Sequence, residues 1–353
     1  MPDKHHPRRG SLQFWPRARS SKHAARVRAW AEVKENKVLG FIGYKAGMTH
    51  LLLKEENKGS PRDGMNVFTP VTVVECPPMK VYSIRFYKRD DNGDLKIISE
   101  IFSKKVDKEF ERKAKSSKKE NKEPEVFDRV TVSLYSQVKL TGIGKKKVDL
   151  VEMHVGGKDL KSKAGYAMSL LDKEVKVSDV LKDSQFVDVH SVTKGKGFCG
   201  VVKKFGVKIM QHKAEKTKRG IGTMWSWTPS QVTFKTPQTG KFGYHLRTEY
   251  NKINVKVGDK PEEINPKGGF VRYGFVKNDY ILIKGSIPGA AKRPITVTEA
   301  MRTKANQKIT AKNIVYTSLE SKQGWKRKSL QLMEQRMVKW IYQNSFQKNL
   351  DQI

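Results

Sequence analysis

Residues 193–248 read TKGKGFCGVVKKFGVKIMQHKAEKTKRGIGTMWSWTPSQVTFKTPQTGKFGYHLRT, and they decide how the rest of the chain is interpreted. Together with the two residues that follow, this stretch contains twelve Lys or Arg against two acids, Glu215 and Glu249. Two tryptophans, Trp225 and Trp227, stand among polar neighbours, and no apolar period is sustained. Such a segment cannot bury enough apolar surface to form its own core. It suits contact with a polyanion, because lysines neutralise phosphates and aromatic rings stack on bases.

The charge of the whole chain supports the same interpretation. Its 353 residues include 71 Lys and Arg against 36 Asp and Glu, a formal net charge of +35. Self-repulsion of this size destabilises a compact state unless a partner supplies the opposite sign. Nucleic acid is the usual partner and an anionic membrane is the rival. No stretch approaches the roughly 18 consecutive apolar residues of a membrane-spanning helix, and the N-terminus lacks the apolar run of a secretion signal. We expect a cytoplasmic protein that is partly unfolded without its partner.

Two cysteines, Cys76 and Cys199, are too few for a disulfide framework or a paired-cysteine zinc site. We expect two inert, buried thiols in a reducing compartment, and neither a metal nor a cofactor.

The segments on either side of the opening stretch carry strand signals, because they are rich in β-branched and aromatic residues with turn residues between them. The fold class we predict is mainly β: a small β-barrel interrupted by two insertions, with long basic extensions. The predicted organisation is a basic N-terminal arm over 1–37, a barrel body over 38–100 and 175–300, an α/β insertion over 101–174, a central extension over 195–250 and a basic C-terminal region over 301–353.

The two ends of the chain are basic as well. Residues 1–37 hold ten basic residues against three acids, and they are either a disordered tail or an arm that orders on RNA. Ser20 or Ser21 is a candidate cap for a short helix over roughly 22–31. Residues 301–353 hold eleven basic residues against three acids, and apolar residues from Leu330 onward recur at helical spacing. This amphipathic helix would pack on protein, or lie on an anionic membrane.

One string resembles a nucleotide-binding motif. Residues 195–200, GKGFCG, match GxGxxG after a predicted strand. A dinucleotide site needs a following helix and an acid about 20 residues further on, and a kinase needs HRD and DFG strings. The residues that follow are basic and predict little helix, and neither string occurs. We expect these glycines to allow close approach to a phosphate backbone. No triad, histidine pair or carboxylate pair indicates catalysis.

Several stretches of the chain are distinctive. The most specific set is FIGYKAGMTH (41–50), VTKGKGF (192–198) and GYHLRT (243–248). The others are PRRGSLQFWPRARS (7–20), VTVVECPP (71–78), WSWTPSQV (225–232), GSIPGAAKR (285–293) and SLESKQGW (318–325). In their order along the chain they resemble the universal large-subunit ribosomal protein L-three family, in its longer archaeal and eukaryotic form.

The resemblance implies a β-barrel on the surface of the large subunit, with the arm and the central loop reaching into the large rRNA. It implies early entry into assembly, a loop tip near the peptidyl-transferase centre, and neighbouring ribosomal proteins as partners. By position Trp227 matches the family's tip tryptophan, and Lys213 to Arg219 match its basic "thumb". Lys218 stands where some eukaryotic members have histidine, so a modification of that histidine does not carry over.

We therefore predict a structural, non-catalytic RNA-binding protein of the ribosome with no small-molecule substrate and no membrane partner. The rivals are an RNA-modifying enzyme with a basic docking surface and a free architectural nucleic-acid binder. The predicted RNA-binding residues are Arg8, Arg9, Trp15, Arg17, Arg19, Lys45, Lys194, Lys196, Gly197, Phe198, Lys203, Lys204, His212, Lys213, Lys216, Lys218, Arg219, Trp225, Trp227, Lys241, His245 and Arg247.

Overall fold

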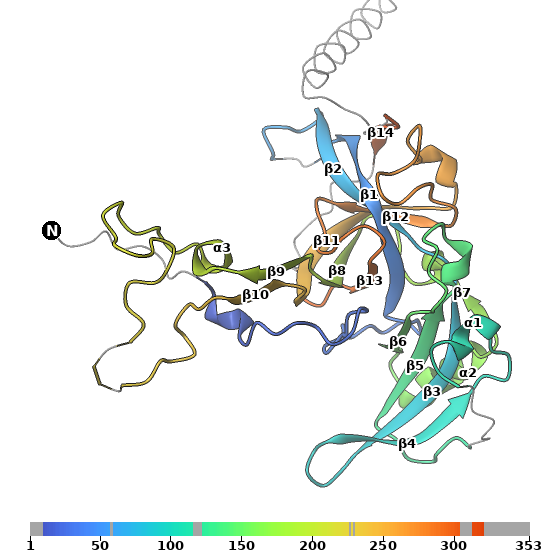
Figure 1. Cartoon of the computed structure of the whole chain (residues 1–353). Helices are drawn as coiled ribbons and strands as arrows, with labels where there is room; N and C mark the ends of the chain where they lie inside the picture. Colours follow the sequence, from blue (N-terminus) through green and yellow to red (C-terminus); the bar gives the residue numbers. More distant parts are fainter. Residues whose placement is uncertain are drawn as a thin grey trace, which may run out of the picture.

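The protein is built from two β-sheets and a projecting two-stranded ribbon (Figure 1). The computed structural model describes residues 10–56, 59–115, 122–225, 227–228, 230–303 and 313–320. Arg8, Arg9 and the amphipathic helix expected after Leu330 lie outside these residues. The mainly β class predicted from the sequence is confirmed.

Within the described residues, six antiparallel strands close into a ring. β13 makes the closure, because it pairs with β1 on one side and with β8 on the other, and the remaining order is β8-β11-β12-β2-β1. A short strand, β14 (Ile314–Thr317), adds to the far end of β1. The ring strands are β1 (Gly40–Lys54), β2 (Asn66–Glu75), β8 (Gln185–Val192), β11 (Leu246–Gly258), β12 (Tyr280–Lys284) and β13 (Pro294–Glu299).

The second sheet has the order β4-β3-β5-β6, with the short β7 paired to β3. Its strands are β3 (Met79–Arg89), β4 (Leu95–Phe102), β5 (Arg129–Ser136), β6 (Leu150–His154) and β7 (Glu174–Val175). Its helices are α1 (Lys108–Glu111) and α2 (Leu160–Ser169). The first two strands lie in the range 38–100 that we assigned to the barrel body. They do not join the ring: β3 pairs with β5 on one side and with β4 on the other, and β4 is the edge strand of this sheet.

The two sheets share one apolar core. Ile42 and Val187 of the ring pack in the same cluster as Ile84 and Leu134 of the second sheet, and all four are fully buried. Burial of such side chains contributes about 1.5–3 kcal/mol each. The sheets therefore form one body.

A polar link crosses the same interface. The Tyr44 hydroxyl donates to Asp149 Oδ2 at 2.7 Å and accepts from Ser136 Oγ at 2.6 Å. Lys145 forms an ion pair with the same carboxylate. Asp149 is 6% exposed, so its charge is compensated inside the protein. This network ties β1 to β5 and to the loop before β6.

The N-terminal arm is extended. After the 3₁₀ turn η1 (Leu12–Phe14), no helix forms over 22–31, so that expectation was wrong. The backbone of the arm forms hydrogen bonds with distant segments instead. The Ser20 N–H donates to the Tyr244 carbonyl at 2.8 Å, and the Val33 carbonyl accepts from the Gly157 N–H at 2.9 Å. The remaining 3₁₀ turns are η2 (Val138–Leu140), η3 (Val177–Asp179) and η4 (Pro261–Glu263).

Candidate nucleic-acid interface

The central extension leaves the ring between two paired strands. β8 and β11 are neighbours, with Val192 opposite Leu246, so the two ends of the extension start side by side. From there β9 (Gly195–Cys199) and β10 (Gly240–Gly243) run outward as an antiparallel ribbon, followed by α3 (Val201–Phe205) and a long loop. Figure 1 shows the ribbon and loop projecting from the body, with the arm alongside.

The ribbon begins at a close approach of two backbones. Gly243 has φ +78°, and a Cβ there would lie 2.1 Å from the Lys194 carbonyl oxygen. Only glycine fits this position, since a side chain meets both a strained φ and a backbone atom. The chain can thus enter and leave the extension through a narrow base.

An aromatic cluster joins the arm to the extension. The Trp15 ring stacks on Phe205 of α3, with centroids 5.8 Å apart and planes 11° from parallel, and meets Phe234 of the loop edge-on at 6.3 Å. The Arg17 guanidinium lies over Phe205 at 4.5 Å, and its Nη1 donates to the Lys204 carbonyl at 3.4 Å. Such stacked and cation–π contacts each contribute about 0.5–1.5 kcal/mol.

Two further contacts hold the arm at the base of the extension. The Arg247 guanidinium lies 4.6 Å from the Phe14 ring centroid. The His245 ring is 5% exposed, and its Nδ1 lies 2.8 Å from the Ala18 carbonyl oxygen. Arm and extension thus form one unit, which we call the arm–extension unit (residues 10–24 and 193–248).

The predicted RNA-binding residues divide by exposure. His245 is buried. Those that are partly buried are Trp15, Arg17, Lys45, Lys204 and Arg247. Those that are exposed are Arg19, Lys194, Lys196, Gly197, Phe198, Lys203, His212, Lys213, Lys216, Lys218, Arg219, Trp225, Trp227 and Lys241.

The most exposed rings lie on the extension. Trp227 is 94% exposed, Phe198 is 77% exposed and Phe234 is 69% exposed, whereas Trp225 is about half-exposed at 46%. Both tryptophans that stand among polar neighbours in the sequence, Trp225 and Trp227, are exposed. A large ring that water surrounds so fully carries no packing role in the isolated chain.

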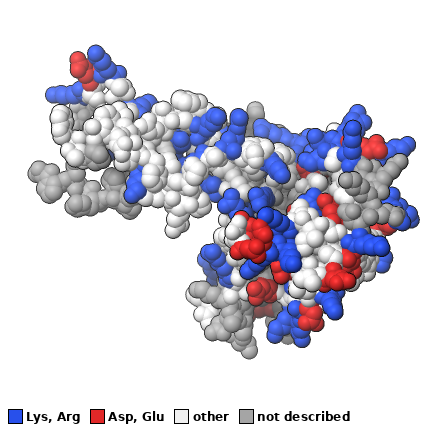
Figure 2. All heavy atoms as spheres, turned by 90° about the horizontal axis from the view of Figure 1, so that it is seen from below, with Lys and Arg blue, Asp and Glu red and all other residues white. Residues whose placement is uncertain are grey.

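The charge of the unit is one-sided. Residues 195–247 contain eleven Lys or Arg and the single acid Glu215. Figure 2 shows basic side chains along the extension and at its far end, whereas acidic ones gather mostly on the body. Two lysines have a lowered pKa. For Lys204 the causes are burial first and then the charge of Arg17, and for Lys45 they are burial first and then the charge of Lys194. An anion that approaches this unit relieves the repulsion between these neighbouring cations.

Lys45 does not lie on the extension. It belongs to β1, and its Nζ donates to the carbonyl oxygens of Ile287 at 2.7 Å and Gly289 at 3.3 Å. Two of its three donor directions are therefore used to fix the loop before β13.

The predicted RNA-binding residues leave out three aromatic side chains that join the arm to the extension: Phe14 of the arm, and Phe205 and Phe234 of the extension. Phe205 had a weak signal, because it follows Val201 by four residues and both are buried on one face of α3. Phe14 and Phe234 had none, since each packs against a segment far away in the chain.

The described part of the chain gives little support to a nucleotide-binding loop, a metal site or a membrane-spanning helix. GKGFCG forms β9 and the residue before α3, and that helix has only five residues. Among the described residues no three His, Cys, Asp or Glu side chains gather as metal ligands would. Cys76 and Cys199 are both buried and unpaired, and burial raises the pKa of the Cys76 thiol. None of the helices that the structure describes has the length and apolar content to cross a membrane.

Comparison with known proteins agrees with the resemblance in the sequence. The family model for ribosomal protein L3 matches residues 1–125 and 124–324. The large ribosomal subunit protein uL3 of Methanobrevibacter smithii is 43% identical over 333 residues, which cover 91% of this chain and 98% of that protein. The proteins of the same name from Methanococcus vannielii and Thermoplasma acidophilum are 44% and 43% identical over 331 residues, covering 91% and 92% of this chain and 98% and 100% of theirs. These names are those of a ribosomal protein and not of an enzyme. The chain belongs to the ribosomal protein L3 family.

Proposed function

We propose that this chain is a structural constituent of the large ribosomal subunit and binds large-subunit rRNA through the arm–extension unit. The observation that carries the proposal is the joining of two basic segments into one slender projection. Glu215 is the only acid among residues 195–247, and the rings of Phe198, Trp227 and Phe234 are open to solvent. Lysine and arginine would neutralise phosphates, and exposed rings would stack on unpaired bases.

The relatives support the ribosomal setting. Each is named as a large ribosomal subunit protein, and the chain spans almost their full length. We infer the same setting here: the cytoplasmic ribosome, with large-subunit rRNA and neighbouring ribosomal proteins as partners. The closed ring and second sheet would lie on the rRNA surface, while the arm–extension unit threads between RNA helices and helps early assembly.

The far end of the extension would support the peptidyl-transferase centre. Trp227 is 94% exposed in the long loop between α3 and β10, so its ring can contact RNA. Figure 1 shows this loop projecting from the body. Peptide-bond formation would be carried out by the RNA itself. The protein would contribute geometry.

Sedimentation of the native protein from a gentle lysate, with and without ribonuclease, tests this function. We expect co-migration with the large subunit that is lost when RNA is digested. Migration as a free small species in both samples would contradict the proposal and would favour an RNA-modifying or architectural role.

A further inference from the structure

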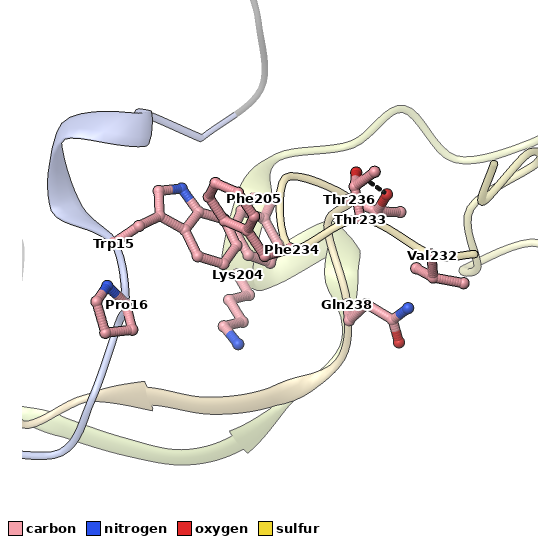
Figure 3. A pocket seen from close by; sticks show the side chains of 9 residues that line it. All are labelled: Trp15, Pro16, Lys204, Phe205, Val232, Thr233, Phe234, Thr236 and Gln238. Atoms are coloured by element: carbon pink, nitrogen blue, oxygen red, sulfur yellow. Dashed lines mark hydrogen bonds between the residues drawn. The ribbon is translucent and has the colours of Figure 1, made fainter. Parts of the chain in front are cut away.

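A cavity of about 670 Å³ lies where the arm meets the central loop. Its walls include Trp15 from the arm, Lys204 and Phe205 from α3, and Thr233, Phe234 and Gln238 from the loop. Figure 3 shows the three rings gathered together, with the Lys204 ammonium and the Gln238 amide on the same side of them. Its size falls in the range of small-ligand sites, about 300–1,000 Å³.

The walls are flat and partly open. Trp15 and Phe205 lie face to face, so each covers one face of the other. Phe234 touches Trp15 only by an edge and is 69% exposed, which leaves much of its ring uncovered. A flat heteroaromatic group can stack on such a surface with little rearrangement.

The polar groups at the cavity suit a nucleotide. Lys204 Nζ lies over the Phe205 ring, 5.2 Å from its centroid, so the ammonium adjoins the aromatic wall. The Gln238 amide is exposed and offers both a donor and an acceptor. Thr236 Oγ1 already donates to the Met224 carbonyl at 3.0 Å, so it holds the loop in place.

We propose that this cavity receives one unpaired nucleobase of the rRNA, stacked against the aromatic wall, with the phosphate of that nucleotide beside Lys204. The inference rests on the proposed function and adds a defined single-nucleotide site to it.

An apolar side chain from a neighbouring protein suits the cavity less well. Lys204 lies at the aromatic wall, and residues 195–247 contain a single acid, Glu215. Covering the Lys204 ammonium with an apolar group removes water and supplies no counter-charge. A nucleotide supplies a flat base and an anion together.

The test measures binding of the full chain to deproteinised large-subunit rRNA at several salt concentrations. Phe234→Ala should weaken binding about 5- to 100-fold, the fold-change for loss of one stacked base. Phe234→Leu, which keeps an apolar side chain but no flat face, should weaken it similarly. Neither variant should change the slope of log K against log salt, whereas Lys204→Ala should reduce its size by about one phosphate contact. Phe275→Ala is the matched control, because this phenylalanine is 53% exposed and lies outside the unit.

Ultraviolet crosslinking of the wild-type complex gives a second readout. Peptide mass spectrometry should find a nucleotide attached to the peptide that contains Trp15 or Phe234, and Phe234→Leu should reduce the yield at that site. Circular dichroism of each variant shows that the fold is intact.

The outcomes separate the two proposals. If wild-type protein binds no rRNA, the proposed function fails. If it binds rRNA and Phe234→Ala binds equally well, only the nucleobase site is overturned. Wild-type affinity in Phe234→Leu together with loss in Phe234→Ala would show that binding needs an apolar side chain at position 234 and not a flat ring, and would overturn the site. Saturable binding of adenosine or uridine monophosphate that rRNA does not displace would indicate a free nucleotide and also overturn it.

Discussion

The ring of His245 and the carbonyl of Ala18 join segments that are 227 positions apart, with Nδ1 and the oxygen separated by 2.8 Å. The other ring nitrogen, Nε2, accepts from the Gly243 N–H at 3.2 Å. Because Nε2 is the acceptor, Nδ1 must carry the proton and donate to Ala18. One buried neutral histidine thus fixes the arm to the base of the extension.

We predict that His245→Ala releases the arm. The substitution leaves the Ala18 carbonyl and the Gly243 N–H without partners, at a cost of about 1–3 kcal/mol. Limited trypsin digestion should cut faster after Arg17 and Arg19, and urea unfolding should show the loss of stability. His212→Ala is the control for stability, since that histidine is exposed. Equal cleavage rates in wild type and His245→Ala would contradict the role.

Gly243→Ala should disrupt the base of the extension. Its Cβ would meet the Lys194 carbonyl oxygen, and its φ of +78° is strained for alanine. Gly197→Ala isolates the second effect, because Gly197 has φ +66° and open space around it. We expect about 1 kcal/mol of destabilisation at Gly197 and clearly more at Gly243. Hydrogen exchange of the β9 and β10 amides measures both, and equal protection in the two variants would argue against the clash.

Acid should weaken the ring through His190. This side chain links three strands, with Nδ1 2.9 Å from Thr248 Oγ1 and Nε2 3.1 Å from Thr298 Oγ1. Burial lowers its pKa from 6.5 to about 4. Between those pH values the unfolded chain binds a proton that the folded chain does not, so the unfolding free energy falls as pH falls. The loss amounts to about 3 kcal/mol by pH 4.

His190→Gln lacks this titration and provides the comparison. Urea unfolding of both proteins from pH 7 to pH 4 should show a steeper decline in the wild type. Parallel curves would show that the histidine does not contribute, since all other titrating groups are common to both.

The basic segment at 213–219 should set part of the salt dependence of rRNA binding. Its lysines are exposed, and each phosphate contact contributes about 0.7–0.9 to the slope of log K against log salt. Replacing Lys213, Lys216 and Lys218 by alanine should reduce the size of the slope by about 2 to 3. The matched control, a triple substitution of the exposed Lys88, Lys173 and Lys277 on the body, should change it less. An identical slope in wild type and the first variant would rule out phosphate contacts there.

Trp227→Ala should separate stability from function. At 94% exposure the ring packs on almost nothing, so the unfolding free energy should stay within about 0.5 kcal/mol of wild type. We expect altered chemical probing of the rRNA around the peptidyl-transferase centre in subunits that contain the variant. Unchanged probing together with unchanged translation would remove this role.

The strands of the body could be predicted because their signal is local. The range 38–53 is rich in β-branched and aromatic residues, and all but its first two residues lie in β1 (Gly40–Lys54). Ile295 to Val297 lie in the strand that closes the ring. The sheet to which a strand belongs has no such signal. β2 and β3 are both rich in β-branched and aromatic residues, yet β2 pairs within the ring and β3 pairs with β5 in the second sheet.

For the site, the sequence by itself determined the charge, the glycines and the presence of aromatic rings among polar neighbours. Residue counts and the lack of an apolar period are properties of the chain alone. Only the tertiary structure decided which of those residues face solvent. Trp15 and His245 are residue types that often contact RNA, and the sequence predicts that role for both. In the structure Trp15 packs on Phe205, and His245 is buried against Ala18. The physical reason is that a periodic pattern specifies which face of a local element is apolar, whereas the distant segment that covers that face is chosen by the packing of the whole molecule.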